Sequence, residues 1–250
     1  MDFTAKKLTH LVALLGVLCT VSLFILYPLI SVFFPTQIPP VYSPSLTPAQ
    51  KLTMELSLLF TQFLFVFAGL VIVPLLWYTL VNRLSLKEIL TRLQLRREGL
   101  STALLWGFLT VIVAFALTIA IGLLYMFVTK IDPSTLSNIP DLQQLFSLPS
   151  LYLIVAIQPF CEELFFRGFL LEKLTKFRGA VFATIVTSVL FGISHLSYTY
   201  AYAAVVAIML GILFSVVVLK TKNLYSAIFA HTLINITSLT LFVLGQSFWI

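Results

Sequence analysis

Seven long apolar runs, separated by short polar or proline-rich stretches, dominate the chain. They cover Leu11–Phe34, Leu56–Val81, Ser101–Val128, Leu151–Leu171, Ala180–Leu196, Tyr200–Leu219 and Tyr225–Trp249. Because a helix needs about 20 apolar residues to cross a bilayer, the pattern predicts an all-α, polytopic membrane bundle of about seven transmembrane helices. The fifth run is short and close to the sixth, so a tight turn or a re-entrant arrangement is an alternative there.

The composition excludes the main alternatives to a membrane protein. Hydrophobic side chains make up 60% of the 250 residues and charged side chains 10%, against about 45–50% and 25% in a soluble domain. The net charge of +6 does not indicate a nucleic-acid partner, because the basic residues fall between the apolar runs and form no stripe. Cys19 and Cys161 lie inside apolar runs and predict neither a disulfide nor a cysteine metal site.

Lysine and arginine concentrate on one side of the predicted spans. With the N-terminus inside, 12 of the 15 lie in cytoplasmic segments: Lys6, Lys7, Arg83, Lys87, Arg92, Arg96, Arg97, Lys173, Lys176, Arg178, Lys220 and Lys222. Lys51 and Lys130 fall outside, and Arg167 lies within a span. Because cytoplasmic loops carry the excess of Lys and Arg, we expect an N-in, C-out topology. The first run is too long for a signal-peptide core, so we expect it to stay as a membrane anchor.

The polar residues within spans divide the chain into two parts. Residues 1–149 are predicted to form N-terminal transmembrane helices, and residues 150–250 a second bundle that carries the chemistry. The proline-rich stretch 35–55 predicts an extended outer loop. Residues 82–100 alternate Leu or Ile with charged groups, which predicts a short amphipathic helix on the inner leaflet, with a polar linker as the alternative.

Three charged residues lie together in the fourth run, namely Glu162, Glu163 and Arg167. A charge at the bilayer centre costs about 3 kcal/mol on insertion scales, so such residues are rare and functional by default. Glu163 and Arg167 are four apart and share a helix face, which predicts an ion pair. This pairing would leave Glu162 free for chemistry, although a purely structural ion pair is the alternative.

Two histidines and an asparagine add to this polar set. Phe191 and His195 are four residues apart, as are His231 and Asn235, so each pair shares a helix face. Taken singly, His231 or Asn235 is typical of hydrogen bonding between membrane helices. Their occurrence in one part of the chain with Glu162 favours a single buried polar site built by three helices.

The order of these residues resembles the three motifs of the CPBP family. The motifs are Glu162-Glu163-x-x-x-Arg167, Phe191-x-x-x-His195 and His231-x-x-x-Asn235. The family comprises the type II CAAX prenyl endopeptidases and related bacteriocin-processing or immunity proteins, and the resemblance covers roughly residues 150–240. It implies an intramembrane endopeptidase in a prokaryotic plasma membrane, with an active site reached from the cytoplasmic side or within the membrane.

The resemblance also implies roles for the motif residues. Glu162 and His195 would activate the attacking water, and His231 and Asn235 would stabilise the oxyanion. Glu163, Arg167 and Phe191 would organise the site. The implied substrate is a peptide precursor or a lipidated protein cleaved near its C-terminus.

A catalytic metal and two other functions are the alternatives. Two histidines and a glutamate match the three-ligand pattern of catalytic zinc, so the ligands of any metal would be Glu162, His195 and His231. Because the sequence has no His-Glu-x-x-His helix, we expect no obligatory cofactor. A non-enzymatic bacteriocin-immunity protein would use the same residues for binding. An ion-coupled transporter is less favoured, since the sequence shows no internal repeat.

Overall fold

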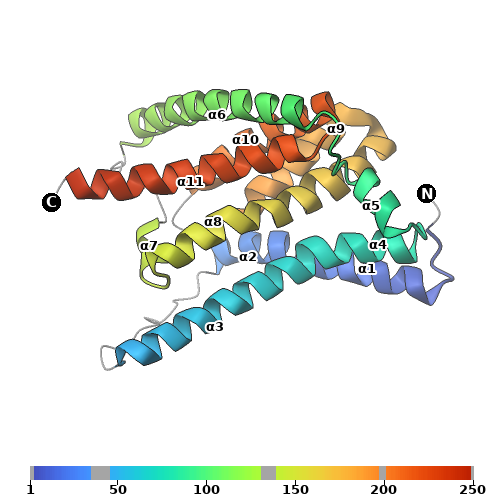
Figure 1. Ribbon diagram of the computed structural model, residues 1–250, viewed down its shortest axis with the longest axis horizontal. Coiled ribbons are helices and arrows are strands. Elements are labelled where there is room, and N and C mark those ends of the chain that lie inside the picture. The colour runs from blue at the N-terminus through green and yellow to red at the C-terminus, as the bar shows by residue number, and fades with distance from the viewer. Residues whose placement is uncertain (1–2, 35–45, 131–138, 197–200, 249–250) are drawn as a thin grey trace.

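The computed structural model describes residues 3–34, 46–130, 139–196 and 201–248. Within these ranges every regular element is a helix, and the helices pack into one bundle (Figure 1). Six of them are long and apolar enough to cross a membrane. The expected all-α, polytopic fold is therefore confirmed, and the chain is an integral membrane protein.

The first two spans are each built from three consecutive helical segments. These are α1 (Leu8–Val21), η1 (Ser22–Leu26) and α2 (Tyr27–Phe33), followed by α3 (Pro48–Phe67), η2 (Ala68–Ile72) and α4 (Val73–Leu80). Both η segments are π-helical, and each ends just before a proline, Pro28 or Pro74. Proline lacks the backbone donor of a regular turn, and a local widening of the helix is one way to accommodate it.

The second span begins earlier than the sequence pattern predicted. Residues 35–45 of the expected outer loop lie outside the described residues, but the helix already starts at Pro48 instead of Leu56. Thr47 and Gln50 form a capping box, in which each side chain bonds the backbone of the other, and Pro48 occupies the first turn. Both features favour a helix start, so reading residues 48–55 as loop was wrong.

A short helix, α5 (Leu86–Arg92), occupies part of the charged segment 82–100. The Ser85 backbone N–H and hydroxyl donate to Glu88 at 2.8 and 2.6 Å, which caps its N-terminus. Ile89 and Leu93 are buried in the same apolar core as the helices around the polar site. The segment is thus packed against the bundle through one face.

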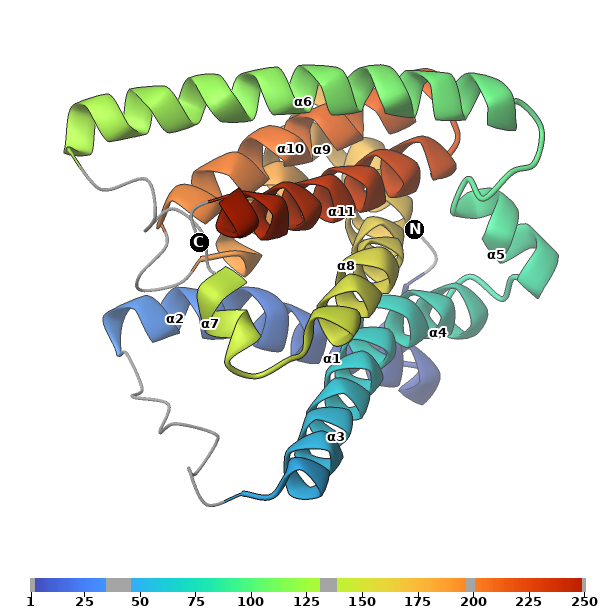
Figure 2. The same cartoon turned by 60° about the vertical axis from the view of Figure 1, so that its left-hand side comes forward.

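The third long helix, α6 (Leu100–Thr129), packs against α10 (Ala201–Thr221) and α11 (Tyr225–Phe248). Figure 2 shows α6 along these two helices, with α1 and α2 on the opposite side of the bundle. The approach is close because Gly107 faces the backbone oxygen of Ser226, where an added Cβ would lie 2.7 Å away. In space, α6 therefore belongs with the C-terminal helices, although it precedes residue 150.

The fourth and fifth predicted runs form one helical stretch, Leu148–Ser194. A short helix, α7 (Ile139–Gln143), precedes it, and the stretch comprises α8 (Leu148–Glu163), η4 (Leu164–Leu170) and α9 (Leu171–Ser194). Non-helical angles at Arg178 and Gly179, with φ +84° at the glycine, break α9 into two helices. This break separates the two predicted runs, and the number of membrane crossings stays a prediction.

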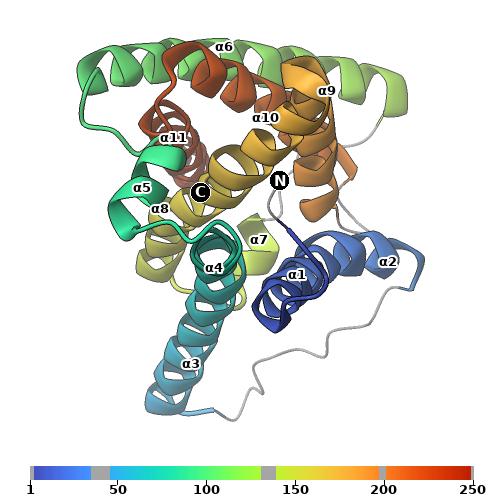
Figure 3. The ribbon, with the colours of Figure 1, turned by 90° about the vertical axis from the view of Figure 1, so that its right-hand side faces the viewer.

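The basic connections gather at one end of the bundle. The start of α1, the end of α4, helix α5 and the start of α6 lie together at this end (Figure 3). Helix α7, the start of α3 and the end of α11 lie toward the other end (Figure 1). The arrangement agrees with alternating helix directions, while the N-in orientation stays a prediction.

Candidate active site

The three intramembrane charges lie at the junction of α8 and η4, where every residue from 161 to 169 is buried. Arg167 Nη1 donates to Glu163 Oε1 at 2.9 Å, and both side chains are 0% exposed. The ion pair predicted from the four-residue spacing is therefore present. Because one carboxylate is paired in this way, Glu162 is the acidic group of the motif that has no arginine partner among the described residues.

His231, on α11, connects the two glutamates. Its Nδ1 lies 2.8 Å from Glu163 Oε1, the oxygen that also accepts from Arg167, and its Nε2 lies 3.8 Å from Glu162 Oε2. A carboxylate paired with arginine only accepts, so Nδ1 of His231 carries the proton of the first contact. The second distance is too long for a direct hydrogen bond, and a water molecule can bridge a gap of this size.

Aromatic rings enclose the ion pair and His231. The ring centre of Phe191 lies 4.2 Å from Arg167 Cζ and 5.7 Å from the His231 ring. Phe214, on α10, stacks on His231 with ring centres 5.0 Å apart. Arg167 Nε and Nη2 have no hydrogen-bond partner in the described part of the chain, and the faces of these rings provide cation–π contacts instead. Phe191 was expected from its motif to organise the site, whereas no sequence signal distinguished Phe214 from other apolar residues.

A pair of glutamines holds Glu162 from its other side. Gln158 Nε2 donates to Glu162 Oε1 at 2.6 Å, and Gln62 Nε2, on α3, donates to Gln158 Oε1 at 3.2 Å. Hydrogen bonds to a charged acceptor are shorter and stronger than neutral ones, so Gln158 fixes the orientation of the carboxylate. The sequence reasoning missed Gln158. Its position four residues before Glu162 is the same helical spacing that identified the neighbouring ion pair.

His195, His231 and Asn235 line one cavity of about 360 Å³ between α6, α7, α8, the end of α9, α10 and α11. The His195 ring presents Nδ1 to the backbone oxygen of Phe191 at 2.8 Å, and a carbonyl oxygen only accepts. Nδ1 therefore carries the proton and Nε2 is the free acceptor. Most of the remaining lining is apolar, for example Leu151 and Val206. No hydrogen bond or ion pair among the described residues joins Glu162 to His195 or to Asn235, so His231 is the link between the glutamates and the cavity.

The segment that carries the candidate site residues is similar to a known protein family. Residues 144–237 match the family model of the type II CAAX prenyl endopeptidases described as Rce1-like. Because of this similarity, we call residues 144–237 the Rce1-like domain. The match contains all seven predicted site residues and confirms the resemblance drawn from the three motifs. No curated protein and no solved structure matches the chain significantly.

The Rce1-like domain begins just before α8 and ends within α11. It therefore includes the helices that carry Glu162, His195 and His231, but neither α6 nor the helix that carries Gln62. The matched family implies protease activity in general, and six apolar helices place the chain in a membrane. The family indicates an intramembrane endopeptidase of the CAAX type.

The sequence suggested Glu162, His195 and His231 as the ligands of any metal. Among the described residues, no group of three His, Cys, Asp or Glu side chains is arranged to hold a metal ion. Glu163 is occupied by Arg167 and His231, and within the described ranges no hydrogen bond or ion pair joins His195 to Glu162 or His231. The ligand set Glu162, His195 and His231 therefore stays a prediction, and the mechanism below uses side chains of the protein alone.

Proposed function

We propose that the Rce1-like domain hydrolyses a peptide bond with a water molecule held between Glu162 and the histidines. The observation that carries this proposal is the 3.8 Å separation of Glu162 Oε2 and His231 Nε2, beside a cavity lined by His195 and Asn235. Peptide hydrolysis needs a base for the water and donors for the developing oxyanion. The site contains candidates for both, with the donors on the cavity wall and Glu162 beside His231.

Glu162 acts as the general base in this mechanism. Gln158 occupies Oε1, which leaves Oε2 to accept a proton from the water. His195, whose Nε2 is an acceptor, orients the same water. The water oxygen attacks the peptide carbonyl carbon and a tetrahedral intermediate forms. Glu162 then transfers its proton to the leaving nitrogen as the carbon–nitrogen bond breaks.

His231 and Asn235 stabilise the oxyanion. For His231 to donate through Nε2, both ring nitrogens must carry protons, and Glu163 accepts the proton on Nδ1. The Asn235 amide supplies further N–H donors on the wall of the same cavity. Glu163, Arg167 and Phe191 act as positioning residues. Glu163 holds His231 directly, Arg167 holds Glu163, and Phe191 packs against the His231 ring on the cavity wall.

The substrate reaches the site within the membrane. On α11, His231 is about 9 Å along the helix from Tyr225 and Leu239 about 21 Å, at 1.5 Å per residue. The cavity extends from His231 past Leu239 to Ile139 and Leu142, near α7. It therefore begins at His231, in the half of α11 nearer the basic end, and extends toward the opposite end of the bundle. Its apolar lining suits a lipid-modified C-terminus or an apolar peptide precursor.

A cleavage assay tests the proposal. The purified protein in proteoliposomes is given a farnesylated peptide and the same peptide without the lipid. We expect Glu162→Gln to lower kcat/KM about 100-fold or more, since it removes the general base. Glu98→Gln, which neutralises an exposed carboxylate outside the site, is the matched control.

Undiminished cleavage by Glu162→Gln would overturn the mechanism. If the wild type cleaves neither peptide while protecting cells from a bacteriocin, the immunity function becomes the explanation for the same residues. The transporter alternative would require uptake that depends on a proton gradient and is lost in the same variant.

A further inference from the structure

A second cavity, of about 550 Å³, lies at the basic end of the bundle between α5 and the turn that joins α10 to α11. Its charged lining consists of four cations and one carboxylate: Lys87, Arg92, Arg96, Lys222 and Glu88. We call it the basic pocket. It lies at the opposite end of the bundle from α7, toward which the catalytic cavity extends, and plays no part in the proposed hydrolysis.

Most of the positive charge in the basic pocket is not neutralised by the protein. Arg92 pairs with Glu172 at 2.9 Å, and Glu88 is held by the capping bonds from Ser85. Lys87, Arg96 and Lys222 have no ion-pair partner among the residues that the structure describes. Three cations therefore converge on a space with only one carboxylate, which favours an anionic ligand.

Hydrogen bonds fix the two segments that supply these cations. The Leu224 backbone N–H donates to the Gln94 oxygen at 2.9 Å. The Asn223 side chain, 2% exposed, donates to the backbone oxygens of Arg96 and Glu98 at 3.0 and 3.3 Å. Because these bonds join residues more than 120 positions apart in sequence, the pocket is a part of the tertiary structure and not a chance meeting of surface lysines.

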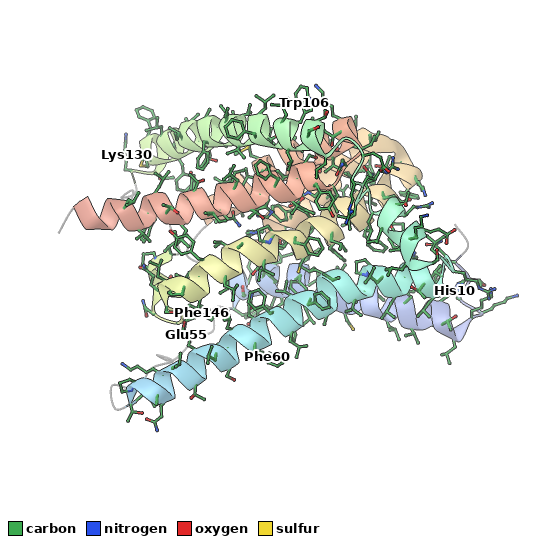
Figure 4. The ribbon with its side chains drawn as sticks, in the orientation of Figure 1. His10, Glu55, Phe60, Trp106, Lys130 and Phe146 are labelled. Atoms are coloured by element: carbon green, nitrogen blue, oxygen red, sulfur yellow. The ribbon has the colours of Figure 1, made fainter. Side chains whose placement is uncertain are left out.

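The position of the pocket matches the headgroup level of a bilayer. Leu86 and Leu90 on α5 are 65% and 40% exposed, next to Lys87 on the same helix. Lys220 Nζ lies 3.4 Å from the ring centre of Trp106. Figure 4 shows Trp106 toward this end of α6 and Lys130 at the other end. Tryptophan prefers the membrane–water interface, and exposed leucines beside lysine are typical of a helix that contacts lipid.

We propose that the basic pocket binds the headgroup phosphate of an anionic phospholipid, such as phosphatidylglycerol, in the leaflet at this end. Basic pockets between membrane helices are known to recognise anionic headgroups. A zwitterionic headgroup brings its own cation toward Lys87, Arg96 and Lys222, whereas phosphatidylglycerol brings only the phosphate and hydroxyls. The bound lipid joins α5 to the α10–α11 turn and so stabilises the end of the helix that carries His231.

Thermal unfolding of the delipidated full-length protein in detergent tests this proposal. Phosphatidylglycerol, phosphatidylcholine and inorganic phosphate are added separately. We expect phosphatidylglycerol to raise the Tm by several degrees, as a ligand of the folded state does, and the other two to leave it unchanged. An equal rise with phosphatidylcholine or with inorganic phosphate contradicts a specific anionic-lipid site.

Charge-matched variants locate the binding site. The double variant Arg96→Gln/Lys222→Gln should lose more than half of the Tm rise. Lys51→Gln/Lys130→Gln, which removes the same charge from the other end, should keep it. Equal rises in both double variants overturn the proposal. If Arg96→Gln/Lys222→Gln is already unfolded before lipid is added, single variants replace the double ones. The Tm rise with phosphatidylglycerol should then be smaller in Lys87→Gln, at an exposed position on α5, than in Lys51→Gln, and equal rises overturn the proposal.

Discussion

His231 Nδ1 lies 2.8 Å from Glu163 Oε1, although the two residues are 68 positions apart and sit on different helices. The same oxygen accepts from Arg167 at 2.9 Å. One carboxylate oxygen thus joins the intrahelical ion pair to the histidine that faces Glu162. Any change at Glu163 or Arg167 should therefore reach the catalytic histidine without altering a residue that contacts substrate.

Breaking this ion pair on one side should cost more stability than removing both partners. Arg167→Met leaves the buried Glu163 carboxylate without its cation, and we expect a loss of about 3–5 kcal/mol in unfolding free energy. Glu163→Gln/Arg167→Met should recover most of this loss, because a neutral amide still accepts from His231. Cleavage should stay at least about tenfold reduced, since that bond is no longer charge-assisted.

Denaturant unfolding in detergent measures the first effect and the peptide assay the second. A double variant no more stable than Arg167→Met would show that the cost comes from lost packing against Phe191 and not from the unpaired charge.

Gln158 should affect turnover more than binding. Gln158→Leu removes the 2.6 Å bond to Glu162, worth about 1.5–3 kcal/mol for a charged acceptor, so we expect kcat to fall about tenfold with little change in KM. Gln62→Leu should have a smaller effect in the same direction, because Gln62 acts only through Gln158. Gln144→Leu, at an exposed position, is the control. A larger effect at Gln62 than at Gln158 would contradict this order.

Close packing at Gly107 should make its replacement costly. A Cβ there would lie 2.7 Å from the backbone oxygen of Ser226, which cannot move away as a side chain can. We expect Gly107→Ala to destabilise the protein by about 1–3 kcal/mol. Gly245→Ala, also in a helix but with no described atom within 4 Å of its added Cβ, should be neutral or slightly stabilising. Equal melting temperatures for the two variants would show that α6 can shift away from α11.

Cysteine labelling in intact cells should report the side on which the catalytic cavity opens. In a chain with Cys19→Ser and Cys161→Ala, we expect Ser238→Cys, on the cavity wall, to react with a membrane-impermeant thiol reagent added outside. Lys51→Cys should react in the same way, and Lys87→Cys only after permeabilisation. Labelling of Ser238→Cys solely in inside-out vesicles would instead establish access from the cytoplasmic side.

The features that the sequence predicted correctly are those that depend on helical spacing and on the length of apolar runs. Spacing alone identified the Glu163–Arg167 pair, and apolar length identified the spanning helices. The sequence did not predict which polar groups meet across helices. Glu162 lies next to His231, and no hydrogen bond in the described part of the chain joins it to His195. The crossing of α9, which ends just before His195, with α10 is set by close approaches that no linear pattern encodes. At Gly192 an added Cβ would lie 2.9 Å from the Ala204 oxygen, and at Gly211 it would lie 2.9 Å from Ser188 Cα.

Gln62 lies outside the segment that matches the Rce1-like family, yet its amide is the first member of the hydrogen-bonded series that ends on Glu162. The carboxylate that we propose as the general base is therefore oriented in part by a helix that the family motifs do not cover. Two relatives with identical motifs but different residues at this position would hold the same glutamate differently. Exchange of the N-terminal helices between such relatives would then change the pH profile of cleavage while every motif residue stayed the same.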